Sequence, residues 1–253
     1  FSVAVALFTV TYLSKRIGLS KRLGTLVAVG TSICGATAIV ATAPAIGAKD
    51  KEISYAIACI TLFGVVAMIF YPYFSYVFFD GNAFASGLFL GTSIHETAQV
   101  AGAGMVYQEL YGDSETMNVA TVTKLVRNLG MLIVIPLMSI TYYRGAENSG
   151  KTLPWWKMIP IFILGFAGMS LIRSIGDSSP LAFGILEPHV WDLFINSTRK
   201  LAELCLGIAM AAIGLGTIFG ELREIGVRPL AIGLSAALLV GGSSAFLITL
   251  LYL

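Results

Sequence analysis

Two stretches of the chain carry nearly the same motif of glycine and hydroxyl-bearing residues. Gly30–Ala41 and Gly91–Ala101 align once one residue of the first is skipped, and both then share Gly-Thr-Ser-Ile and Thr-Ala-x-Val-Ala. The second stretch alone adds an imidazole, a carboxylate and an amide, from His95, Glu96 and Gln99. Ionisable groups in apolar surroundings are costly and usually face a cavity or a partner. The repeated motif is therefore the first place to look for chemistry.

This combination of residues favours anion binding. A Gly-Thr-Ser break in an apolar segment offers backbone N–H groups and hydroxyls, and two facing breaks would aim two positive helix N-termini at one point. His95 adds a donor that titrates near neutral pH, and Glu96 is expected to orient it or to carry a coupling proton. The predicted substrate-binding residues are Gly30, Thr31, Ser32, Gly91, Thr92, Ser93, His95, Lys124, Arg127 and Asn128, and the predicted coupling residues are His95, Glu96 and Gln99.

Lys124, Arg127 and Asn128 join the prediction because their spacing of i, i+3 and i+4 puts them on one helix face. Plainer interpretations stay open. Gly-Thr-Ser can be a helix cap with close packing, and Lys124 and Arg127 can extend to the outer membrane interface. His95 and Glu96 can pair for packing, although neighbours on a regular helix diverge by about 100°.

Enzymatic chemistry is the weaker alternative. His95-Glu96 begins like a zinc-protease helix, but the second histidine of that motif is absent, and no Walker loop or Gly-x-Ser-x-Gly elbow occurs. An intramembrane enzyme would use Ser32, Ser93 and His95 as a nucleophilic dyad. We predict no metal site and no cofactor.

The composition places the chain in a membrane. Of its 253 residues 57% are hydrophobic and 12% charged, with mean hydropathy +0.84, whereas soluble domains carry about 25% charged residues. Apolar runs of roughly 20 residues recur along the chain, which predicts an all-α polytopic membrane protein. The net charge of +2 is scattered, which argues against nucleic-acid binding. Cys34, Cys59 and Cys205 are expected to be buried thiols.

Charge bias predicts the orientation. Lys15, Arg16, Lys21 and Arg22 follow a first helix that ends at Ser14 and mark the cytoplasmic side, whereas the loop with Glu109, Asp113 and Glu115 suits the outer face. The loop with Arg144, Lys151 and Lys157 and the turn 221–228 are expected inside. The polar stretch 176–197 is expected to be an outer loop that contains a short amphipathic piece. Trp155 and Trp156 are expected interfacial anchors, and Gly216 to Gly220 a surface for close helix packing.

The two motif segments either cross the membrane or enter it and return, and charge bias cannot choose between these arrangements. A helix that contains a proline follows each motif, with Pro72 after the first and Pro136 after the second. This similarity favours an inverted repeat of broken or re-entrant segments. We expect one transmembrane domain over 1–253, repeat-related segments 23–79 and 83–143, and C-terminal helices within 158–253. Because the chain opens on Phe1 inside an apolar run, we expect further residues before it.

Four motifs in order resemble the YeiH-like family of bacterial inner-membrane proteins. They are Gly30-Thr31-Ser32-Ile33-Cys34-Gly35-Ala36, Thr61-Leu62-Phe63-Gly64 with Tyr71-Pro72, Gly91 through Val100, and Lys124-Leu125-Val126-Arg127. Members are usually labelled sulfate exporters, commonly carry Asp at the position of Glu96, and have several helices ahead of Phe1. The resemblance implies sulfate or a small sulfonate as substrate.

The sequence thus predicts a secondary transporter of a small anion in the bacterial inner membrane, coupled to a proton or ion gradient. The alternatives are a cation- or proton-coupled carrier of organic acids and, from another class, an intramembrane enzyme or a non-transporting membrane sensor. The expected partners are the anionic substrate and the lipid bilayer, and self-association into a homo-oligomer is left open.

Overall fold

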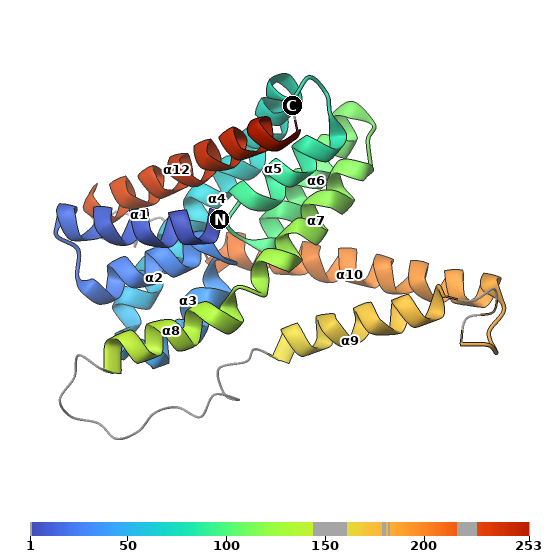
Figure 1. Cartoon of the computed structure of the whole chain (residues 1–253), viewed down its shortest axis with the longest axis horizontal. Coiled ribbons are helices and arrows are strands. Elements are labelled where there is room, and N and C mark those ends of the chain that lie inside the picture. The colour runs from blue at the N-terminus through green and yellow to red at the C-terminus, as the bar shows by residue number, and fades with distance from the viewer. Residues whose placement is uncertain (1, 144–160, 179–180, 182, 217–226, 253) are drawn as a thin grey trace. The chain divides into compact units, whose positions relative to one another are not determined.

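The structure is a computed structural model that describes residues 2–143, 161–178, 181, 183–216 and 227–252 (Figure 1). Within these ranges the chain is helical and forms no β-sheet, which confirms the predicted all-α class. The chain divides into two compact units, and each is described by itself. The first unit comprises Phe1–Met158 with Thr217–Leu253, and the second comprises Ile159–Gly216.

The helices of the first unit are short except for α4 and α12, with 29 and 26 residues. In chain order they are α1 (Ser2–Ile17), α2 (Lys21–Ser32), α3 (Ala36–Ile46), α4 (Asp50–Phe78), α5 (Ala83–Ser93), α6 (Thr97–Tyr111), α7 (Glu115–Asn128), α8 (Met131–Tyr143) and α12 (Val227–Tyr252). By length and composition, Asp50–Phe78, Glu115–Met138 and Pro229–Tyr252 can cross a membrane, while α3 and α5 are apolar but shorter. The short helices lie where the two motif copies were found.

Helices α2 and α3 form a hairpin that enters from the end bearing Lys15 and Lys21, here called the basic end. The start of α2 lies beside the start of α4, because Ser20 Oγ donates to Glu52 at 2.7 Å. The end of α2 lies further along α4, where a Cβ on Gly30 would sit 2.3 Å from Ile60 Cδ1. Helix α2 is therefore parallel to α4. Since α3 ends where α4 begins, α3 runs back to the basic end.

Helices α5 and α6 form a second hairpin from the opposite end, here called the acidic end for Asp113 and Glu115. Helix α5 is antiparallel to α4, because Ser86 Oγ donates to the Ser75 carbonyl and the rings of Phe89 and Tyr71 are 5.0 Å apart. Helix α6 returns parallel to α4: Gln99 reaches Thr61, and Tyr111 stacks on Tyr76 with ring centroids 3.7 Å apart.

The two hairpins meet tip to tip. At about 1.5 Å per residue, the 12 residues of α2 and the 11 of α5 each reach roughly 17 Å, about half of a 30 Å hydrocarbon core. Helix α4 links the first hairpin to the second and runs from the basic to the acidic end. The kinked α7–α8 pair then runs back, because Tyr142 OH donates to the Lys21 carbonyl at 2.7 Å. Both motif segments are thus re-entrant and inversely related, as the sequence favoured.

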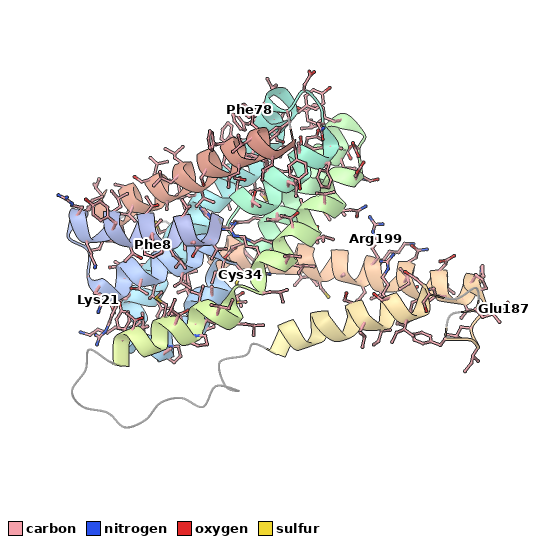
Figure 2. All side chains as sticks on the ribbon, in the orientation of Figure 1. Phe8, Lys21, Cys34, Phe78, Glu187 and Arg199 are labelled. Atoms are coloured by element: carbon pink, nitrogen blue, oxygen red, sulfur yellow. The ribbon has the colours of Figure 1, made fainter. Side chains whose placement is uncertain are left out.

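Apolar packing at each end holds the hairpins. One buried cluster at the basic end includes Leu26, Ile39 and Ile60, and another at the acidic end includes Phe79 and Phe89. Cys34, labelled in Figure 2, lies at the tip of the first hairpin and is 4% exposed. Its thiol donates to Met131 Sδ at 3.4 Å. The tips therefore lie in the protein interior between the two clusters.

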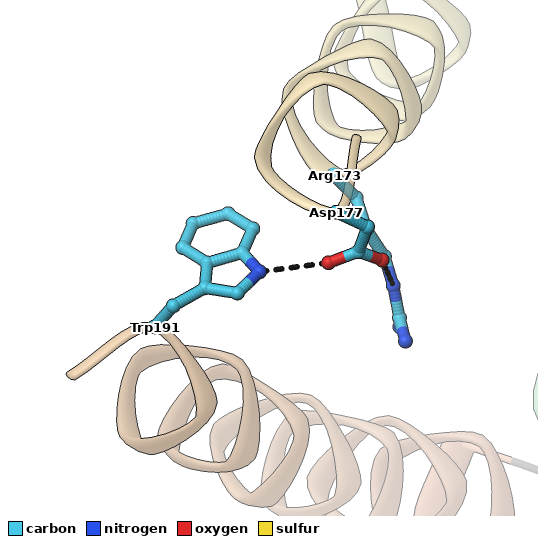
Figure 3. Close-up of polar contacts among 3 residues, drawn as sticks. All are labelled: Arg173, Asp177 and Trp191. Atoms are coloured by element: carbon cyan, nitrogen blue, oxygen red, sulfur yellow. Dashed lines mark hydrogen bonds and ion pairs between the residues drawn. The ribbon is translucent and has the colours of Figure 1, made fainter. Parts of the chain in front are cut away.

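The second unit contains α9 (Ile161–Gly176) and α10 (Pro188–Gly216). Trp191 Nε1 donates to Asp177 at 2.8 Å, and Arg173 forms an ion pair with Asp177 at 3.3 Å (Figure 3). A Cβ on Gly176 would lie 2.4 Å from the Trp191 ring, so the indole packs directly against the end of α9.

Several sequence predictions for this part of the chain need correction. The amphipathic piece expected within 176–197 is not short, because α10 begins at Pro188 and continues past Arg199 as one helix. Cys205 is exposed rather than buried, while Cys34 and Cys59 are buried as expected. Predictions on Arg144, Lys151, Trp155, Trp156, Lys157, 217–220 and 221–226 lie outside the described residues.

Candidate functional site

Each motif copy ends a helix rather than beginning one. Gly30, Thr31 and Ser32 form the last turn of α2, and Gly91, Thr92 and Ser93 form the last turn of α5. The chain leaves helical geometry at residues 33–35 and 94–96 and then starts α3 and α6. At the first break Gly35 has φ +73° and ψ −129°, a conformation that glycine adopts readily because it lacks a Cβ.

The motif hydroxyls mostly stay within their own helices. Thr31 Oγ1 donates to the Val27 carbonyl at 2.7 Å, Thr92 Oγ1 donates to the Leu88 carbonyl at 2.6 Å, and Ser32 Oγ donates to the Ala28 carbonyl. Thr92 Oγ1 also shares a hydrogen bond with Ser244 on α12. These three hydroxyls are therefore not the free donors that we expected, because intrahelical carbonyls already occupy them.

Gly30 and Gly91 allow helices to approach closely. A Cβ on Gly91 would lie 2.5 Å from the Ala120 carbonyl oxygen of α7, and the close contact of Gly30 with Ile60 on α4 is of the same kind. Both positions are buried. Their observed role is to bring the broken helices against the crossing helices.

Lys124 joins the two tips. Its ammonium donates to the carbonyls of Ile33 and Ile94 at 2.8 Å each, and also to the carbonyl of His95. Three carbonyl acceptors need three N–H donors, which only the charged ammonium provides. Lys124 is fully buried. It therefore does not reach the outer interface, and its charge is placed between the ends of both broken helices.

Arg127 makes a second link one helical turn further along α7. Its Nε donates to the Ser32 carbonyl at 2.8 Å, and its two terminal nitrogens donate to the carbonyls of Thr31 and Thr92. The last carbonyls of a helix have no intrahelical partner and carry its negative dipole end. Lys124 and Arg127 thus neutralise the C-terminal ends of α2 and α5, a role that the sequence reading missed.

Glu96 reaches across to the first hairpin. One carboxylate oxygen accepts a hydrogen bond from the Ala36 N–H, the first amide of α3, at 3.3 Å. A Cβ on Gly35 would lie 2.3 Å from Glu96 Cγ, so the glycine is what lets the side chain approach. The carboxylate therefore occupies the positive N-terminus of α3. The N-terminus of α6 has no side-chain cap.

Gln99 fits into a notch on α4. Its amide nitrogen donates to the Thr61 carbonyl at 3.2 Å, and its oxygen lies over Gly64, where a Cβ would approach to 1.9 Å. Asn128 donates to Thr97 Oγ1 at 3.3 Å. Both amides therefore join α6 to a crossing helix.

Several buried polar atoms near the tips lack a hydrogen-bond partner. They are Ser93 Oγ, His95 Nδ1, Glu96 Oε2, Gln99 Oε1 and Asn128 Oδ1. The five residues are at most 4% exposed. Buried polar groups are nearly always paired with protein or water, so this concentration indicates a place that receives water or a ligand.

The charge at this point is net positive. Each helix end counts as about half a charge. The positive charges, about three units, come from Lys124, Arg127 and the N-termini of α3 and α6. The negative charges, about two units, come from Glu96 and the C-termini of α2 and α5, which leaves an excess of about one positive unit. If Glu96 takes up a proton, the excess rises to about two units. An excess of positive charge attracts anions, and the protonation state of one carboxylate sets its size.

The structure gathers most of the predicted residues at the two tips, including Ser93, His95, Glu96, Lys124 and Arg127. Ser32 and Ser93 make no hydrogen bond to His95 among those found in the described chain, so no nucleophilic dyad is formed there. Gly35 and the Ala36 amide were not among the predicted site residues. The positive φ of Gly35 depends on tertiary packing, and a backbone amide is present at almost every residue. Residue types therefore could not identify either one as part of the site.

Two inverted, re-entrant hairpins with a polar centre define a polytopic helical membrane protein built on an inverted repeat. The family model described as "Conserved hypothetical protein 698" matches residues 1–233. The chain belongs to this family, that of the UPF0324 membrane proteins, which is the YeiH-like family indicated by its motifs. It is a multi-pass membrane protein.

Relatives from several bacteria support this assignment. A UPF0324 membrane protein of Yersinia pestis is 33% identical over 81% of this chain and 55% of its own length. A relative in Fusobacterium nucleatum is 30% identical over 92% of this chain and 67% of its own length, and one in Streptococcus agalactiae is 31% identical over 78% and 55%. The chain thus spans about half the length of several curated relatives it matches. No solved structure matches it.

Proposed function

We propose that the chain forms the substrate-binding part of a secondary transporter for a small anion, with sulfate or a sulfonate as the first candidate. The observation that carries the proposal is the tip-to-tip meeting of two inverted hairpins around buried Lys124 and Arg127. Inverted repeats whose broken helices meet near mid-membrane are a recurrent transporter design.

The anion is proposed to bind beside the second tip. Ser93 Oγ and His95 Nδ1 are buried there without partners, and the first turn of α6 has no side-chain cap. Helix N-termini and hydroxyl and imidazole donors together suit a sulfate-like anion. Lys124 and Arg127 act through their charge, because carbonyls already engage all three donors of the lysine and three of the five of the arginine.

Glu96 is proposed to couple transport to protons. As a carboxylate it occupies the N-terminus of α3 through the Ala36 N–H. When Glu96 is protonated, its hydrogen bond with that amide becomes much weaker. The net charge of the site rises by about one positive unit, which favours binding of a dianion. Proton uptake and anion binding then favour each other, which is the requirement for coupling.

Uptake into proteoliposomes tests the proposal. The purified protein is assayed with sulfate, a short alkyl sulfonate, an organic dicarboxylate and chloride, with and without an imposed pH gradient. We expect uptake of at least one oxyanion that the gradient drives. His95→Ala should weaken binding by roughly ten- to hundredfold, the value of one charge-assisted hydrogen bond. His189→Ala, which changes the exposed histidine of α10, is the matched control.

Uptake of the dicarboxylate alone would favour the organic-acid carrier over an exporter of sulfur oxyanions. Absence of gradient-driven uptake for every anion, in protein that is folded by thermal melting, would contradict the transporter proposal.

A further inference from the structure

A groove runs between α1 and α8, away from the hairpin tips. Its first part is a cavity of about 240 Å³ at the basic end, and its second is a cavity of about 380 Å³ further along the helices. The two cavities share Thr11, Lys15 and Met138 in their walls. The two cavities therefore adjoin each other, and together they are called the groove.

The groove exists because α1 packs along α2 while α8 packs on α3 and reaches α2 through Tyr142. Ser14 of α1 lies against α2, where a Cβ on Gly24 would approach Ser14 Cβ to 2.7 Å. Tyr142 of α8 shares a hydrogen bond of 2.7 Å with Thr25 of α2. The walls of the groove are thus α1 and α8, and α2 forms the floor of its smaller part.

The two parts differ in chemistry. The 380 Å³ part is mainly apolar, and Phe8 (Figure 2) and Leu137 on its walls are 80% and 51% exposed. The 240 Å³ part carries Lys15 and Lys21 together with Ser14, whose buried Oγ lacks a hydrogen-bond partner. Lys15 lines both parts and Lys21 only the smaller one, so the positive charge lies at the basic end of a mainly apolar groove.

Lys21 is partly fixed for binding at that end, since its ammonium lies 4.6 Å from the centre of the Tyr142 ring. Arg16 and Arg22 add to the same basic cluster. Glu52 accepts from Ser20 at the edge of the cavity but also accepts from the Lys49 N–H at 3.0 Å, so the start of α4 already engages its charge. The local field favours an anion.

We propose that this groove binds one anionic phospholipid. The headgroup phosphate lies at Lys15 and Lys21, and an acyl chain follows Phe8 and Leu137. The amphipathic groove and its charge argue for a lipid over a free anion, because a free phosphate would leave the apolar part uncovered. Basic residues at the cytoplasmic ends of helices attract anionic lipids by about 1 kcal/mol each.

The test compares phosphatidylglycerol with phosphatidylcholine of the same acyl chains. Native mass spectrometry of the unaltered protein should retain one phosphatidylglycerol in preference to phosphatidylcholine, and phosphatidylglycerol should raise the melting temperature. Lys15→Gln with Lys21→Gln should weaken binding by about 25-fold, or about fivefold for each lysine. Lys49→Gln, which removes an exposed charge at the same end outside the groove, should bind like the parent.

Thr11→Phe separates the groove from simple charge attraction, because Thr11 lines both cavities and the larger ring would fill them while both lysines stay. We expect this variant to lose phosphatidylglycerol binding. Equal retention of both lipids by the unaltered protein would overturn the proposal. So would the same stabilisation by inorganic phosphate alone, or unchanged lipid binding in the folded double-lysine or Thr11→Phe variants.

Discussion

The Glu96 carboxylate of one hairpin accepts a hydrogen bond of 3.3 Å from the Ala36 N–H of the other. The two groups are 60 residues apart in sequence and come from segments that enter the protein from opposite ends. A negative side chain at a helix N-terminus is favourable. This contact therefore joins the two repeats through a group that can change its charge.

Gly35→Ala should disturb this contact. The Cβ would lie 2.3 Å from Glu96 Cγ, and φ at this position is +73°. Gly47→Ala is a control for the positive φ alone, because Gly47 has φ +62° in the αL region and no atom within 4 Å of a new Cβ. Gly47→Ala carries the αL backbone cost of about 1–2 kcal/mol. Gly35→Ala adds the contact with Glu96 and a larger backbone cost, since ψ of −129° lies outside αL, so it should melt at a clearly lower temperature. Equal melting temperatures would mean that Glu96 moves aside without cost.

Lys124→Met should destabilise the protein strongly. It leaves three buried carbonyls without their donor, and one unsatisfied buried group already costs about 1–3 kcal/mol. We expect a loss of at least about 3 kcal/mol, measured by thermal or denaturant unfolding in detergent. Lys49→Met, at an exposed position, should unfold like the parent. Parent-like stability of Lys124→Met would show that the lysine does not hold the tips together.

The hairpin arrangement predicts that the basic and acidic ends face opposite sides of the membrane. Cysteines at Lys49 and Ser114, both exposed, should be labelled by a membrane-impermeant reagent from the cytoplasmic and the outer side, respectively. The Cys205→Ser background is needed because Cys205 is exposed. Labelling of both positions from the same side would exclude the orientation.

The contact between α9 and α10 should weaken in acid. The hydrogen bond from Trp191 holds the pKa of Asp177 below its ordinary value of 3.8. A depressed carboxyl pKa stabilises the fold above the ordinary value, and this stabilisation is lost as the pH falls through the folded pKa. In a Trp155→Phe, Trp156→Phe background, Trp191 fluorescence should report this change. Asp177→Asn should remove the acid response, and Glu187→Gln should keep it.

The sequence predicted the helical class and the residues at the tips, because the motif recurs and because charged residues in apolar segments are conspicuous. Hydropathy could not distinguish crossing from re-entrant segments, since Lys21–Ile46 has the length of one full span. Only contacts such as Ser20 with Glu52 and Ser86 with Ser75 decide it.

The roles of individual residues were harder to predict than their location. Lys124 and Arg127 were expected to face an anion, whereas they bind the carbonyls that end α2 and α5. Those carbonyls belong to Ile33, Ile94 and neighbouring residues, whose side chains carry no polar signal. The contact of Thr92 with Ser244 joins residues 152 apart, with no pattern to link them.

The coupling role of Glu96 is tested most directly by sulfate affinity as a function of pH, measured on the parent and on Glu96→Gln. If one proton enters with each anion, the affinity of the parent should fall by about tenfold per pH unit above the titration of Glu96. Glu96→Gln should bind sulfate with the high, low-pH affinity at every pH, because the amide keeps the shape but cannot titrate. Glu109→Gln, at an exposed position of α6, should behave like the parent. A parent whose affinity does not change with pH, or a Glu96→Gln variant that keeps the slope, would contradict the account.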